Sequence, residues 1–367
     1  MYHLNRFSNL CICVCMCMGM YNGAAYASGA DAHATLNESV GVLHKSVTDM
    51  RDACVGISDD LKHLQALAGG AAGVSGAGVV AGGVALGTGI AKSAADRDAM
   101  KKDTELYHAQ WEKLKKDAPD VEFDNEHAPD VDLITCFIDE LTPSSTKWAG
   151  VSDEELQKLR QAADYARRGK KLGDVRTATT GVAALTNAVG AGLAATNLSD
   201  YKSGLSGRIA KCLDAGVSVK RALMQAQMDK DAFLKANKAD ELATYTANGV
   251  LSDQYVSDVN AAVRACEALA DIDFSKNTRR ASGAVASGVI GAATGFAGMV
   301  TSMSANSKTN YLSGSNKEKG LNTASNVLAG TTAATGVAGA VFNATQISEL
   351  KRALSVADAC KGALNFK

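Results

Sequence analysis

Apolar residues in the first third of the chain follow a heptad spacing. They recur at alternating steps of four and three, at Leu36, Val40, Leu43, Val47, Met50, Cys54, Ile57, Leu61 and Leu64. This spacing predicts a helix with a coiled-coil face. In the same register the following positions are small: Ala68, Ala71, Ser75, Gly78, Gly82, Ala85 and Gly89. We therefore expect one long helix that packs more tightly toward its end, with Gly56 as its weakest point.

Four segments rich in glycine and alanine carry no charge, at 64–91, 177–199, 281–307 and 320–348. Each exceeds the roughly 20 residues that a helix needs to cross a bilayer. Three of them share an Ala-x-Thr-Gly-x-Ala motif, within 178–184, 292–298 and 333–339, which indicates an internal repeat.

Glycines in these segments lie at helical contact spacing. An exposed glycine costs a helix in water about 1 kcal/mol, whereas glycines four apart let membrane helices approach closely. The expected helix-packing positions are Gly69, Gly73, Gly78, Gly82, Gly83, Gly87, Gly288, Gly291, Gly295 and Gly298. The stripes at 69–87 and 288–298 resemble those of glycine-zipper envelope proteins. This resemblance implies membrane association and self-assembly.

The same segments are also compatible with a soluble bundle. Leucine and isoleucine are scarce in them, and Asn187 and Asn343 lie inside two of them. Close alanine and glycine contacts in a water-soluble hairpin give a similar pattern, so both environments remain open.

Charged, amphipathic helices are expected between the uncharged segments. All prolines fall between 119 and 143, no stretch alternates like a strand, and Ser152 with Glu155 forms a capping-box pattern.

The expected fold is all-α, with long antiparallel helices and a glycine-zipper bundle. The expected divisions are a signal peptide (1–27), a heptad helix with the first segment (28–98), charged helices with an acidic loop (99–172), the second segment (173–207), a helical hairpin (208–280), the third and fourth segments (281–348) and a C-terminal amphipathic helix (349–367).

The N-terminus has the features of an export signal. Arg6 precedes an apolar run at 10–20, and Ala25-Tyr26-Ala27 is a small-x-small cleavage motif. We expect the mature chain to begin at Ser28; an uncleaved anchor is the alternative.

The cysteines beyond this signal are expected to meet at one side of a membrane. Four crossings by the uncharged segments place Cys54, Cys212, Cys266 and Cys360 on the exported side and Cys136 on the other. In an oxidising compartment, chain order favours the pairs Cys212–Cys266 and Cys54–Cys360. Buried free thiols are the alternative, since sequence alone allows three pairings.

Patterns typical of cofactor, metal or nucleic-acid sites are weak. The net charge of −1 gives no field that attracts nucleic acid. In 87–93 the sequence resembles a phosphate loop, but Lys92 does not directly follow the last glycine. The acidic stretch 117–132 lacks the glycine turn of a calcium loop and is interpreted as a solvated linker. The histidines show no metal-ligand spacing, so no catalytic, cofactor or metal site is expected.

These patterns favour a non-enzymatic, exported protein of the cell-envelope membrane. The expected partners are membrane lipid and further copies of the chain, in a scaffold or a pore-like bundle. The alternative is a periplasmic or secreted soluble helical protein of the adhesin or effector type. An enzyme is the third hypothesis.

Overall fold

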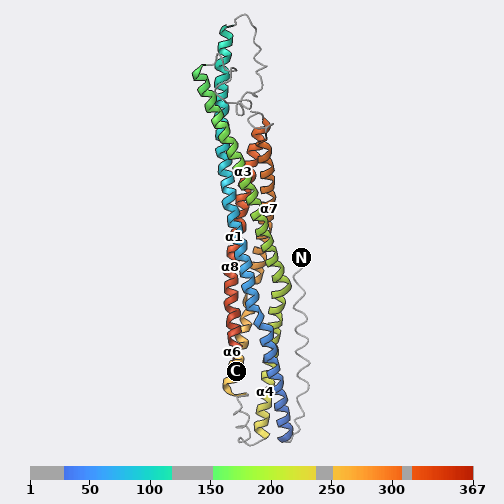
Figure 1. Ribbon diagram of the computed structural model, residues 1–367. Coiled ribbons are helices and arrows are strands. Elements are labelled where there is room, and N and C mark those ends of the chain that lie inside the picture. Colours follow the sequence, from blue (N-terminus) through green and yellow to red (C-terminus); the bar gives the residue numbers. More distant parts are fainter. Residues whose placement is uncertain (1–28, 118–151, 237–250, 308–315, 367) are drawn as a thin grey trace. The chain divides into compact units, whose positions relative to one another are not determined.

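The computed structural model describes residues 29–117, 152–236, 251–307 and 316–366, and these residues form helices without a strand. Figure 1 shows their arrangement. The helices are α1 (Gly29–Asp117), α3 (Asp153–Asp200), the π-helix η2 (Tyr201–Leu205), α4 (Ser206–Ala236), α6 (Asp253–Glu267), the 3-10 helix η3 (Ala268–Asp271), α7 (Phe274–Ala305) and α8 (Asn316–Ala363). The all-α prediction is confirmed for this part of the chain.

The chain divides into two units that are interleaved in the sequence. Unit 1 comprises 1–60, 204–272 and 353–367, and unit 2 comprises 61–203 and 273–352. Helices α1 and α8 each contribute to both units. The boundaries expected at 98 and 348 therefore fall inside continuous helices rather than between elements.

Unit 1 is a helical bundle with a mainly apolar core. Its buried side chains are large and apolar, including Leu36, Leu43, Met50, Ile57, Val219, Leu223, Phe233, Val259, Val263 and Leu269. Helix α4 packs against α6 and η3. Ion pairs lie at the surface, between Arg208 and Asp60 at 3.2 Å and between Lys220 and Glu267 at 2.5 Å. The guanidinium of Arg208 also covers Gly56, so this glycine lies under a side chain rather than at a break in α1.

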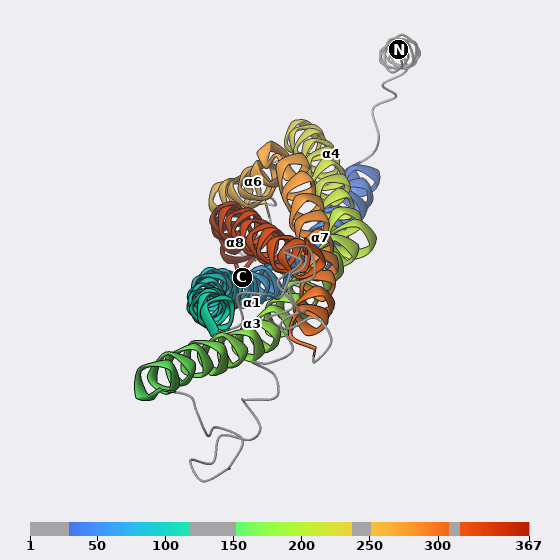
Figure 2. The same ribbon diagram turned by 90° about the horizontal axis from the view of Figure 1, so that it is seen from above.

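Unit 2 is an antiparallel bundle of α1, α3, α7 and α8. Near one end, the Asn197 side chain donates to the carbonyl of Leu64, and Arg280 pairs with Glu349 at 2.5 Å. Near the other end, Arg176 donates to Ser302. Helices α1 and α7 therefore run in one direction and α3 and α8 in the other. Figure 2 looks along these helices and shows α7 next to α8.

The heptad register of α1 forms a nearly continuous buried line. From Leu36 to Gly89, every position of that register is buried except Val40, which is half-buried. The large side chains up to Ile57 belong to unit 1, whereas Leu61, Leu64 and the small side chains from Ala68 onward belong to unit 2. The prediction of one helix that crosses from large to small contacts is confirmed.

The start of α3 has the expected capping box. The Ser152 hydroxyl accepts from the Glu155 amide at 3.3 Å, and the Glu155 carboxylate accepts from the Ser152 amide at 2.9 Å. Two amides that lack helical partners are thereby satisfied.

Several expectations lie outside the described residues. These are the signal peptide at 1–27, the proline-containing acidic stretch and Cys136.

Replacing Ser152 with alanine should destabilise the first turn of α3 by about 1 kcal/mol, because both reciprocal hydrogen bonds are lost. Hydrogen exchange of the amides at 153–156 should become roughly five- to tenfold faster. Ser218→Ala, on the exposed surface of α4, is the matched control and should leave exchange unchanged. Equal rates in wild type and Ser152→Ala would show that the box does not hold this end.

Candidate functional site

The interior of unit 2 consists of small and polar side chains. Within the four uncharged segments, every buried residue is Gly, Ala, Ser, Thr, Asn or Gln, apart from Leu64 at the edge of the first. Helix α7 illustrates this composition, with a buried line of Ala281, Ala284, Ser287, Gly288, Gly291, Gly295, Gly298, Ser302 and Ala305. The space between these helices therefore contains almost none of the large apolar side chains that fill a water-soluble core.

The large apolar side chains of these segments point outward. The exposed ones are Val80, Val84, Ile90, Val182, Leu185, Val189, Val289, Ile290, Phe296, Val300, Met303, Val327, Val337 and Val341. Their exposure reaches 68% at Val80 and 62% at Val327. Such an apolar exterior around a small, polar interior is the reverse of the distribution in unit 1. It is the arrangement expected of helices whose surroundings are hydrocarbon.

Four described helical stretches are long and apolar enough to cross a membrane. They lie within Ala32–Leu106, Asp153–Ala236, Phe274–Ala305 and Asn316–Ala363, and so coincide with the four predicted segments except for residues 306 and 307 of the third.

The glycines of α7 lie against α3 and α8 at distances that exclude a side chain. A Cβ at Gly288 would lie 2.7 Å from the Cβ of Ala191, and one at Gly295 would lie 2.7 Å from that of Ala184. A Cβ at Gly291 would lie 2.6 Å from Asn187 and Thr335, and one at Gly298 would lie 3.0 Å from Thr180. All four glycines expected at helix contacts on α7 thus face neighbouring helices of the same chain.

The expected packing glycines of α1 divide into two groups. Gly78 faces Asn187 and Thr186 of α3, and Gly82 faces the backbone of Ala333 in α8. At the others, a Cβ would have no neighbouring atom within 4 Å: Gly69, Gly73, Gly83 and Gly87. Gly76 is open in the same way. These open glycines share one outward face of α1, because their spacings of four, three, seven and four keep them in one heptad register.

Polar groups cross the middle of the unit 2 interior. Asn187 donates to the Thr332 carbonyl at 3.4 Å, and the hydroxyls of Thr332 and Thr294 lie 3.0 Å apart. From the sequence alone, the polar side chain of Asn187 argued against membrane insertion of the second segment. In the structure it is buried between helices, where a polar side chain can join neighbours even when the surroundings are apolar.

A charged layer closes one end of this interior. Buried Arg176 donates to Ser302 at 2.9 Å and to Asn322 and Asn326 at 3.2 Å each. Lys92 forms a buried ion pair with Asp96. Burial raises the pKa of the Asp96 carboxyl, and the neighbouring Lys92 ammonium opposes that rise. The phosphate-loop-like sequence around Lys92 is helical, and the lysine bonds within its own helix.

This charged layer was not predicted from the sequence, although the heptad register contained the signal. Continued past Gly89 by steps of three, four and three, the register reaches Lys92, Asp96 and Ala99, and all three are buried.

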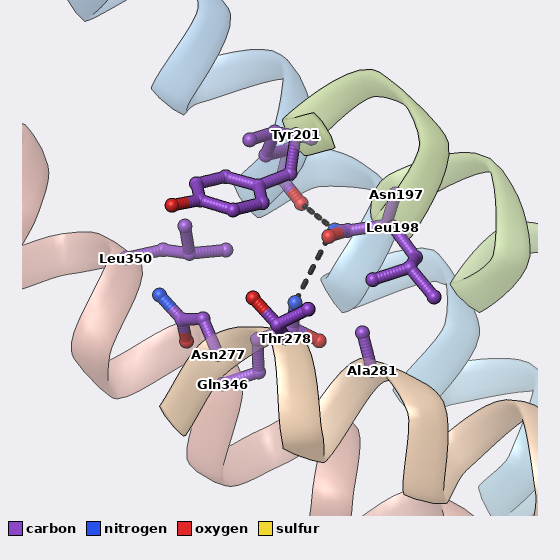
Figure 3. Close-up of a pocket in the computed structure, with 9 residues that line it drawn as sticks. Asn197, Leu198, Tyr201, Asn277, Thr278, Ala281, Gln346 and Leu350 are labelled. Atoms are coloured by element: carbon purple, nitrogen blue, oxygen red, sulfur yellow. Dashed lines mark hydrogen bonds between the residues drawn. The ribbon is translucent and has the colours of Figure 1, made fainter. Parts of the chain in front are cut away.

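A small cavity lined by both apolar and polar side chains lies toward the opposite end of unit 2 (Figure 3). Its volume is about 10 Å³, which is near the minimum for one water molecule. Gln346 donates to Asn197 at 2.9 Å, and Asn197 donates to the Leu64 carbonyl at 2.7 Å. Among the described residues, the side-chain oxygens of Asn277 and Gln346 have no hydrogen-bond partner. The cavity is too small for an organic substrate.

The four cysteines beyond the N-terminal region that the structure describes meet in the core of unit 1. Cys54, Cys212, Cys266 and Cys360 are all buried, and their sulfur atoms lie within 4.8 Å of one another. Each comes from a different helix: α1, α4, α6 and α8. They are the one group of three or more His, Cys, Asp or Glu side chains with metal-ligand proximity among the described residues.

The disulfide pairing differs from the expected one. The structure joins Cys54 to Cys212 and Cys266 to Cys360, with Cα atoms 4.9 and 4.6 Å apart. The expected pairs Cys212–Cys266 and Cys54–Cys360 followed from chain order, which does not determine which helices are neighbours.

No family model matches the chain, and neither a curated protein nor a solved structure is significantly similar to it.

Replacing Gly295 with alanine should destabilise unit 2 by about 1–3 kcal/mol, because the added methyl meets both side-chain and backbone atoms of Ala184. Gly192→Ala, on the exposed side of α3, is the matched control, and its methyl enters open space. That control should be neutral or stabilise the helix by up to about 1 kcal/mol. Thermal unfolding in detergent measures both changes, and equal losses of stability would contradict the close helix approach.

Proposed function

We propose that the protein is a non-enzymatic, exported membrane protein in which unit 2 is the membrane-embedded part and unit 1 lies in water. The observation that carries this proposal is the reversed distribution of side chains between the two units. Unit 1 buries large apolar side chains, whereas the four uncharged segments of unit 2 expose theirs and bury small and polar side chains, apart from Leu64. In hydrocarbon there is no hydrophobic force between helices, so close packing and interhelical hydrogen bonds hold such a bundle.

The ends of the uncharged segments support this placement. Lys62, Asp200, Arg280 and Glu349 lie near one end of the bundle, and Arg176, Lys92 and Glu318 near the other. The segments between them are all longer than the roughly 20 residues that span a hydrocarbon core.

The path of the chain supports placing all of unit 1 on one side of the membrane. The chain passes between the units at residues 60, 203, 272 and 352, and all four points follow the same end of the unit 2 bundle. After four crossings, unit 1 and its cysteines therefore fall on one side of the membrane. An exported, oxidising side is compatible with the two disulfides.

Ile290→Arg tests this environment. Ile290 is 51% exposed near the middle of α7, where a charge in a bilayer costs about 2.5–3.5 kcal/mol. We expect wild-type protein to stay with membranes after carbonate washing and the variant to lose most of this resistance. A soluble protein would tolerate the change, since surface substitutions in water usually alter stability by less than about 0.5 kcal/mol.

Met224→Arg is the matched control in unit 1, at a position that is 59% exposed. It should fractionate like wild type. Release of wild type and both variants into the carbonate supernatant would favour the secreted, soluble alternative instead.

We also propose that copies of the chain associate through the outward face of α1 formed by Gly69, Gly73, Gly76, Val80, Gly83 and Gly87. The α7 glycines are already occupied by helices of the same chain, so they cannot serve this purpose. At the glycines of this face, a Cβ would meet no atom of the described residues within 4 Å, yet each of these glycines weakens the helix relative to alanine. Close approach of another helix would offset that cost.

The double change Gly73→Leu and Gly87→Leu should reduce cross-linked dimers in membranes at least tenfold while leaving monomer unfolding unchanged. Gly192→Leu is the matched control, because this glycine is open and exposed on α3. Undiminished dimers in the double variant, or an equal loss in the control, would exclude the α1 face as the contact.

A further inference from the structure

We infer that the reduced form of unit 1 binds one zinc ion between Cys54, Cys212, Cys266 and Cys360. The inference concerns unit 1 alone and does not depend on membrane insertion of unit 2.

All four sulfur atoms converge on one point in the core of unit 1. Two structural disulfides require only that each cysteine meet its own partner. Here the two pairs also meet each other, so that all the sulfur atoms lie within 4.8 Å. Bridges formed at different levels of the bundle would have joined the same helices without this convergence. A tetrahedral metal site, in contrast, requires four ligands around one point.

The geometry is close to that of a zinc tetrathiolate. A Zn–S bond of about 2.3 Å places the sulfur atoms of a tetrahedron roughly 3.8 Å apart. Sulfur atoms of different bridges must therefore approach by about 1 Å at most, while those within a bridge separate. Because the four ligands come from four helices, side-chain rotation and small helix shifts can supply this movement.

The surroundings suit a closed, structural site rather than a catalytic one. All four cysteines are buried. Met50 and Val263 lie beside Gly216, one helical turn after Cys212. A closed four-coordinate site leaves no position for water or substrate.

Zinc binding and the bridges exclude each other. Reduction of each disulfide adds two electrons and two protons and gives two thiols. A dithiol supplies both and becomes a disulfide, whereas a phosphine supplies the two electrons and becomes a phosphine oxide, with its oxygen and the two protons taken from water. Zinc then displaces the four thiol protons into solvent. The cluster therefore joins the four helices through metal before oxidation and through bridges after it.

Cobalt and zinc binding to the full chain in detergent tests this inference. The protein is prepared with Ser in place of Cys11, Cys13, Cys15, Cys17 and Cys136, so that only the cluster can supply thiols. After reduction by a phosphine under argon, Co²⁺ should give the absorption of a tetrahedral tetrathiolate site. Native mass spectrometry with Zn²⁺ should show one ion per chain.

Two further samples test whether the four thiolates bind the metal. The same protein with both bridges intact should bind neither metal. Adding Cys266→Ser should lower affinity at least tenfold and change the cobalt spectrum, because one of the thiolate ligands is lost. Circular dichroism checks that this variant is helical. No metal uptake by the reduced chain, or equal uptake after Cys266→Ser, overturns the inference.

Discussion

The close approach of α3 and α7 is the constraint on which the rest of unit 2 depends. At Gly288 and Gly295 even a methyl group would lie 2.7 Å from an alanine of α3. Leucine, valine and phenylalanine cannot occupy such a seam, so the large apolar side chains of these helices must point outward. The apolar exterior is thus a direct consequence of how tightly the helices pack. In water this exterior would be a liability, whereas in lipid it matches its surroundings.

The polar groups inside unit 2 follow from the same constraint. A narrow seam admits Ser, Thr and Asn, and each can hydrogen-bond a neighbouring helix. Asn197, for example, joins the Leu64 carbonyl of α1 to the Gln346 side chain of α8. Arg176 similarly joins α3 to α7 and α8 through three side-chain hydrogen bonds. If unit 2 lies in a membrane, as proposed, such bonds and the close contacts would supply the specificity of the bundle, because the hydrophobic effect does not drive helices together in hydrocarbon.

Much of the fold could be predicted from the sequence, because helix signals are local. The heptad register of α1, the Ser152 capping box and the four uncharged segments depend on spacing within a single helix. The sequence was a poorer guide to which helices contact one another. The glycines at 291 and 73 have the same local pattern, yet one faces Asn187 and the other faces outward. The cysteine pairing was wrong for the same reason, since neither chain order nor spacing states which helices are neighbours.

Because α1 is one continuous helix, its heptad register stays constant while the size of the side chains on that register changes. One heptad line runs from Leu36 to Gly89, so the same helical face meets partners in both units. Only the size of the residues on that line changes, from leucine and isoleucine to alanine and glycine. Where the residues of this register are large, other positions of the helix carry charged side chains, as at Asp49, Arg51 and Lys62. Where the residues of this register are small, the large apolar residues lie at the exposed positions of the helix. Along one continuous helix, the buried register therefore changes from large to small residues while the exposed positions change from charged to apolar.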